Sequence, residues 1–193
     1  NYAWAYQALG DGPVPETVVV LGLSHAPVAP PLVLTRQAYD TPFGPVPADV
    51  EFIDALESRV DIDLFEDELV HVSEHSVEFQ VLWLRHLYPD ADGLRIVPIL
   101  CGSLPEDAWS ADALAGTAWD RAVSALAETI ATWPRRVTVI GGADLSHVGP
   151  HFGDPEPADD QRLAEVHRLD HEALTRAAEG DADGFLRSFQ ADG

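Results

Sequence analysis

The chain has 193 residues, 46% of them hydrophobic, so it is long enough to bury the core of one ordinary globular domain. Its formal charge is -22 and all 11 basic residues are arginine, which argues against nucleic-acid and anionic-membrane partners, because clustered Lys and Arg bind phosphate. The single cysteine, Cys101, excludes an internal disulfide framework and any multi-cysteine zinc cluster built from this chain alone.

The two ends of the sequence favour a cytoplasmic piece of a longer protein. No apolar run approaches the ~20 residues of a membrane span, and Asn1 to Trp4 lacks the basic and then apolar order of a signal peptide. The chain has no methionine, and we expect Asn1 not to be the natural start. We therefore expect residues 1–193 to form a single domain that is truncated at both ends, with functional residues beyond them.

Apolar runs and helical periodicities alternate along the chain. Short β-branched runs bounded by turn residues predict strands, and apolar residues three and four apart predict amphipathic helices. The prolines of residues 26–47 exclude regular structure there except a short edge strand. In chain order we expect a helix over Tyr2 to Leu9, a strand over Thr17 to Leu21, an edge strand near Val33 to Thr35, helices over Asp49 to Arg59 and His75 to Tyr88, a strand over Leu94 to Leu100, a helix over Ala111 to Thr132, a strand over Arg136 to Ile140, and a helix over Asp159 to Ala178 that Gly180 ends.

This alternation predicts an α/β fold with a mainly parallel sheet that helices cover on both faces. In open sheets of this class, ligands bind beyond the carboxyl ends of the strands. Polar groups follow the predicted strands at these ends: Ser24-His25, Cys101-Gly102-Ser103 and Asp144-Leu145-Ser146-His147. Two of the predicted strands are therefore each followed by a histidine near their carboxyl end.

Four side chains are candidates for one functional site: His25, His75, Asp144 and His147. His75 opens a predicted helix, whose N-terminus at the sheet edge can direct its first side chain into the same crevice. Neutral imidazoles bind iron, copper or zinc, and imidazoles also transfer protons near neutral pH. The sequence predicts that the four side chains converge in one metal-assisted or acid–base site.

Each candidate also has a structural alternative. His25 and His147 can be loop histidines that bind backbone groups, although strand-end loops are often functional. His75 can be a helix-cap residue. For Cys101, a buried thiol is a better interpretation than a ligand or a nucleophile.

The other histidines predict no site. His167 and His171 lie four apart on one predicted helix, a spacing that can bind a metal, but the charged residues around them favour a solvated face. His71 and His86 carry no functional signal.

Five short motifs occur in order along the chain: GLSH at residues 22–25, YDTPFG at 39–44, EHSVE at 74–78, IVPILCG at 96–102 and GADLSHVG at 142–149. In this order and spacing they resemble the Memo family, whose bacterial and archaeal members are labelled AmmeMemoRadiSam system protein B. The resemblance implies a three-layer fold like that of class III extradiol ring-cleaving dioxygenases, which hold non-haem Fe(II) at a strand-end site.

The resemblance also implies a role for each candidate. His25 matches a metal ligand, and His147 matches the acid–base histidine of the dioxygenases, with Asp144 beside it. His75 matches a pocket histidine that faces the substrate.

Two glutamates and some departures from the family pattern complete the comparison. Glu74 and Glu78 would orient the groups that contact the metal. The family has two adjacent histidines where this chain has one histidine followed by Ala26. The resemblance implies three metal ligands, of which one, in a His-Ala-Gly-aromatic motif, is expected before Asn1 and another, in a Cys-Gly segment, after Gly193. Cys101 is not expected to be that cysteine.

Two classes of function stay open. One is a metal-dependent oxidoreductase that acts on a small aromatic substrate, with Fe(II) as the first expectation and Cu or Zn as alternatives. The other is a protein that binds a metal or a peptide in the same pocket without turnover. The expected partners are a small molecule or a peptide, and a second copy of the chain is a further possibility.

Overall fold

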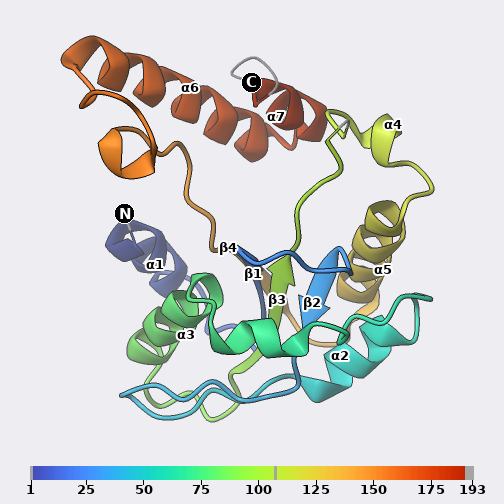
Figure 1. The fold of residues 1–193 in the computed structure, drawn as a ribbon. Coiled ribbons are helices and arrows are strands. Elements are labelled where there is room, and N and C mark those ends of the chain that lie inside the picture. Colours follow the sequence, from blue (N-terminus) through green and yellow to red (C-terminus); the bar gives the residue numbers. More distant parts are fainter. Residues whose placement is uncertain (1, 107, 190–193) are drawn as a thin grey trace. The chain divides into compact units, whose positions relative to one another are not determined.

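The computed structural model describes residues 2–106 and 108–189 (Figure 1). The chain divides into two compact units. The sheet unit comprises Asn1–Leu104 and Gly116–Ala143, and the helical unit comprises Pro105–Ala115 and Asp144–Gly193.

The sheet unit contains all four strands that the structure describes. Its elements are α1 (Tyr2–Gly10), β1 (Thr17–Leu23), β2 (Leu32–Leu34), α2 (Val50–Glu57), the 3-10 helix η1 (Glu68–Val72), α3 (Ser76–Leu87), β3 (Arg95–Cys101), α5 (Ala118–Thr132) and β4 (Val137–Gly141). The strand order is β2-β3-β1-β4. β1 pairs in parallel with β3 and β4, and β2 pairs antiparallel with β3 at the edge. The prediction of a mainly parallel sheet is confirmed.

Helices cover both faces of this sheet, as Figure 1 shows. On one face, side chains of α2 and α5 pack against Val19, Val97 and Ile99. On the other face, side chains of α1 and α3 pack against Val18 and Val20. Val18, Val19 and Val20 are completely buried, because the strand that carries them has helices on both sides. The sheet unit is therefore a three-layer α/β structure, as expected.

The helical unit contains α4 (Ala111–Leu114), the 3-10 helix η2 (Pro150–Phe152), α6 (Asp160–Glu179) and α7 (Ala182–Ser188). The side chain of Asp159 accepts a hydrogen bond from the backbone N–H of Arg162 and caps α6. Gly180 ends α6 in the left-handed conformation, with φ of 73°, which glycine adopts without a steric penalty. The predicted helix and its end at Gly180 are confirmed, with bounds that agree to within one residue.

One predicted helix is wrong. The segment Ala111 to Thr132 forms two helices, α4 and α5, because the chain turns at Gly116, where φ is +73°. The side chain of Thr117 then accepts a hydrogen bond from the backbone N–H of Asp120 and starts a new helix. In the described residues, no helix combines the length and the apolar character needed to cross a membrane.

Candidate functional site

The carboxyl end of β1 lies against the start of α3. Gly22 permits this contact, because a Cβ atom added there would lie 2.5 Å from Oγ of Ser76 and 2.8 Å from a methyl group of Val77. The hydroxyl of Ser76 accepts a hydrogen bond from the backbone N–H of Leu23 at 3.0 Å and donates one to the carbonyl of Leu23 at 3.1 Å. The glycine of the GLSH motif therefore serves close packing between a strand and a helix.

His25 follows this strand and is held by Glu74, which comes just before α3. The backbone N–H of His25 donates to Oε1 of Glu74 at 2.6 Å, and Nδ1 of the His25 ring lies 2.8 Å from Oε2. The side chain of Glu74 is 6% exposed and that of His25 is 60% exposed. Because a carboxylate can only accept, Nδ1 carries the proton and the lone pair of the neutral ring is on Nε2.

The electrostatics of Glu74 agree with this arrangement. Burial by itself raises the pKa of the Glu74 carboxyl, but hydrogen bonds and charge from His25 outweigh it and hold the pKa below its usual value. Glu74 therefore carries its negative charge in the buried position beside the imidazole.

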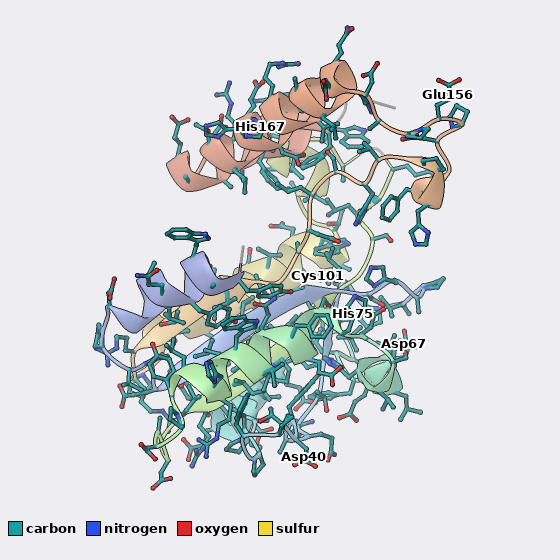
Figure 2. All side chains as sticks on the ribbon, turned by 90° about the vertical axis from the view of Figure 1, so that its left-hand side faces the viewer. Asp40, Asp67, His75, Cys101, Glu156 and His167 are labelled. Carbon is teal, nitrogen blue, oxygen red and sulfur yellow. The ribbon has the colours of Figure 1, made fainter. Side chains whose placement is uncertain are left out.

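His75 lies next to His25 and faces it ring to ring. Their ring centroids are 5.5 Å apart and the planes differ by 10°, and the ring of Phe79 makes an edge-type contact with His75, with centroids 5.4 Å apart. His75 occupies the N-cap position of α3, but its side chain makes no capping hydrogen bond. Figure 2 shows His75 and Cys101 at the same edge of the sheet.

Asp144 and His147 form a second pair, in the helical unit. Nε2 of His147 lies 2.8 Å from Oδ2 of Asp144, and the His147 ring stacks on Phe152 with centroids 4.5 Å apart. The hydroxyl of Ser146 donates to Oδ1 of Asp170 at 2.6 Å and ties this turn to α6. The side chain of His147 is 48% exposed and that of Asp144 is 65% exposed.

The four predicted residues thus occur as two pairs, His25 with His75 and Asp144 with His147. Each pair is made within one unit. The convergence of all four in a single pocket stays a prediction.

The structure also shows a buried histidine that the sequence did not indicate as important. His71 in η1 is 8% exposed; its Nδ1 lies 2.8 Å from the hydroxyl of Tyr39, and its Nε2 lies 3.0 Å from the carbonyl oxygen of Val33. The only sequence signal was the motif that begins at Tyr39. No local sequence pattern predicts a buried histidine whose two hydrogen-bond partners lie elsewhere in the chain.

The remaining candidates have simple explanations. Cys101 is partly buried at the end of β3, and burial raises the pKa of its thiol to about 11, so the sulfur is protonated at neutral pH. This agrees with the interpretation of Cys101 as a buried thiol. His167 and His171 are exposed on α6, with ring centroids 6.3 Å apart.

The described part of the chain contains individual side chains that can bind a metal ion, but these do not form a complete set of ligands. In residues 2–106 and 108–189, no three or more His, Cys, Asp or Glu side chains form a group that could hold a metal ion. The donor chemistry of His25 fits a ligand, because its ring is largely exposed and a carboxylate fixes the tautomer that keeps a lone pair on Nε2.

Comparison with known proteins identifies the family. The Memo-like protein family model matches residues 1–192. A MEMO1 family protein of Thermus thermophilus is 29% identical over 96% of this chain and 51% of its own length. MEMO1 family proteins of Aquifex aeolicus and Caldivirga maquilingensis are 30% and 31% identical, over 82% and 86% of this chain and 38% and 53% of their own lengths. The chain thus spans about half the length of the curated relatives it matches, or less, and it belongs to the Memo-like protein family.

Proposed function

We propose that His25 is one ligand of a mononuclear transition-metal site at the carboxyl edge of the sheet, in a metal-dependent oxidoreductase that acts on a small aromatic substrate. The observation that supports it is the contact between Nδ1 of His25 and Glu74 at 2.8 Å. Histidines that bind metals commonly donate their other ring N–H to a carboxylate, which fixes the ring and raises its basicity.

The choice of metal follows from the ligand and from the family resemblance. Imidazole nitrogen suits Fe, Cu and Zn, and the resemblance to class III extradiol dioxygenases makes Fe(II) the first choice. Such an ion supplies the redox chemistry when it is bound. Within this chain, Glu74 orients His25, and the ring of His75 lies parallel to that of His25 and offers a flat surface to an aromatic substrate.

Proton transfer is assigned to His147. Asp144 binds the Nε2 end of the ring, so it fixes the ring orientation, and Nδ1 is the atom at which a substrate proton would be taken or returned. Losing such a group typically reduces turnover by about 100-fold or more. This role does not require contact with a metal.

The test compares three variants of the full-length protein, purified without chelator, by metal analysis and by oxygen consumption with simple catechols. His25→Ala is expected to empty the site. His147→Ala is expected to keep metal near the wild-type content while any turnover falls by about 100-fold or more. His167→Ala, which changes an exposed histidine of α6, is the matched control and should leave both measurements unchanged.

Two results would count against the proposal. If His25→Ala retains wild-type metal content, His25 is not a ligand. If His147→Ala removes the metal as completely as His25→Ala, His147 is itself a ligand and the division of roles is wrong. Metal binding without turnover on any phenolic compound would instead favour a protein that binds metal or peptide without catalysis.

A further inference from the structure

A chain of hydrogen bonds connects the loop after β2, the helix η1 and the edge strand β2. The carbonyl of Val33 can only accept, so Nε2 of His71 carries the proton and donates to it at 3.0 Å. Nδ1 of the neutral ring then accepts from the hydroxyl of Tyr39 at 2.8 Å. His71 therefore uses both ring nitrogens to hold η1 on the edge of the sheet.

Other contacts fasten the same segment to its surroundings. The hydroxyl of Thr35 donates to Oε1 of Glu68 at 2.7 Å, and the backbone N–H of Ala29 donates to Oδ2 of Asp67 at 2.7 Å. In contrast, two apolar side chains of η1, Leu69 and Val72, are 84% and 86% exposed. The segment thus exposes two of its apolar side chains and makes several polar contacts, of which the one between His71 and the carbonyl of Val33 is buried.

Glu74 follows η1 after a single residue. The backbone N–H of Ser73 donates to the carbonyl of Val70 and closes the 3-10 helix, so the position of Glu74 depends on how η1 lies on the sheet. A displacement of Glu74 by a few tenths of an ångström would lengthen the contacts of 2.6 and 2.8 Å that Glu74 makes with His25.

We propose that Tyr39 and His71 are positioning residues for the Glu74–His25 pair, and that protonation of His71 weakens the metal affinity of His25 by releasing η1. The inference rests on the proposed role of His25 as a ligand. It makes the metal site sensitive to acid through a histidine that does not touch the metal.

The chemistry of a protonated His71 explains the release. With a proton on both nitrogens, Nδ1 of His71 becomes a donor, so the Tyr39 oxygen can only accept from it and the hydroxyl hydrogen loses its present acceptor. A buried polar group without a partner is costly. The observed arrangement, in which Tyr39 donates to Nδ1, therefore requires neutral His71, and protonation must rearrange the contacts that hold η1.

Burial keeps His71 neutral under ordinary conditions. Burial lowers the pKa of His71, and this outweighs the hydrogen bond to Val33 and the negative charges of Glu68 and Glu74, which favour the cation. The partner hydroxyl also keeps its proton, because burial, and then the charge of Glu78 on α3, raise the pKa of Tyr39. Both groups are thus in the protonation states that the observed hydrogen bond requires.

The experiment titrates the full-length protein with Co²⁺ alone and follows the visible absorption of the bound ion. His71→Phe is expected to weaken Co²⁺ binding by about 10- to 100-fold, the usual effect of losing support around a ligand. Tyr39→Phe removes one hydroxyl and should cost about 10-fold. His71→Gln can still donate to the carbonyl of Val33 and cannot be protonated, so it should stay within about 3-fold of wild type.

Acid provides the second readout. Burial lowers the pKa of His71, so its protonation lies below the usual histidine value of about 6.5. As the pH falls from about 6.5 through this lowered pKa, wild-type affinity should fall about 10-fold further than that of His71→Gln. The difference isolates His71, because protons compete for the ligand itself in both proteins. Parallel pH curves for the two proteins, or a His71→Phe variant within about 3-fold of wild type, would overturn the inference.

A matched control separates positioning from general loss of stability. Thr17→Val removes the buried hydrogen bond from Thr17 to Oδ2 of Asp49, 2.6 Å long, at the amino end of β1, and should leave Co²⁺ affinity unchanged. If Thr17→Val weakens binding as much as His71→Phe, the effect of His71 is on stability alone and the inference fails.

A measurement without metal distinguishes failure of the inference from failure of the proposed function. ¹⁵N chemical shifts of the His25 ring report the tautomer and the hydrogen bond at Nδ1. His71→Phe should move the Nδ1 signal of His25, and Thr17→Val should not. If His25→Ala binds Co²⁺ normally, the proposed function fails, and the His25 ring shifts alone then decide whether His71 positions Glu74.

Discussion

Replacing Gly22 with alanine is expected to lower the free energy of unfolding by about 2–5 kcal/mol, because β1 and α3 touch at this residue. The new Cβ would lie 2.5 Å from Oγ of Ser76 and 2.8 Å from Cγ2 of Val77, and overpacking of this kind costs about 1–3 kcal/mol. Moving Ser76 also weakens its two hydrogen bonds to Leu23, at about 1 kcal/mol each. The smaller conformational entropy of unfolded alanine returns about 0.4–1 kcal/mol.

Urea unfolding followed by tryptophan fluorescence measures this loss. The matched control is Gly141→Ala at the end of β4, where an added Cβ has no atom within 4 Å and φ is not in the left-handed region. This control should change stability by no more than about 1 kcal/mol in either direction. Equal losses for the two variants would refute the reasoning, since they would show that contact with α3 is not what requires a glycine at position 22.

Three further predictions concern protonation. Hydrogen bonds to His25 hold the pKa of Glu74 below its usual value, so the stability that this carboxylate provides is present above about pH 4.3 and is lost as the pH falls further. Urea unfolding at several pH values should show that Glu74→Gln is less stable than wild type at neutral pH and that the difference disappears in acid. Burial lowers the pKa of His71, so unfolding takes up a proton below about pH 6.5 and wild type should lose stability there; His71→Gln should flatten that part of the stability curve, and an unchanged slope would contradict the assignment. Burial raises the pKa of Cys101 to about 11, so iodoacetamide should alkylate the native protein slowly at about pH 8 and the urea-unfolded protein at the rate of a free thiol, whose pKa is about 8.5.

Sequence patterns determined the local elements of this protein, because the forces that start and end a helix or strand act over a few residues. Asp49 was predicted to begin a helix, and its side chain accepts the capping hydrogen bond from Phe52. Gly180 was predicted to end one, and it adopts the left-handed conformation that glycine permits. The sequence analysis missed the break at Gly116, because the alanine-rich segments on both sides of it have the helix propensity expected of one continuous helix.

The candidate site was only partly accessible from the sequence. The placement of His25 and Asp144-Leu145-Ser146-His147 after predicted strands followed from β-branched runs and the rule for open sheets, and the structure places His25 directly after β1 and residues 144–147 just after β4. The family resemblance indicated Glu74 only as a residue that orients metal-contacting groups. Its pairing with His25 became visible in the structure, because nothing in the local sequence joins two residues that are 49 positions apart.

Tertiary structure alone decided which polar groups are paired and buried. His71 contacts Tyr39 and Val33, which lie 32 and 38 residues before it in the chain. Gly22 is required by the helix that starts at Ser76, and Ser76 binds Leu23, which lies 53 positions earlier in the sequence. Helix caps and strand patterns are set by neighbours in sequence, whereas hydrogen bonds between distant side chains exist only after the sheet and its helices have packed. For this reason the fold class could be predicted from the sequence, while the support around His25 became visible only in the folded chain.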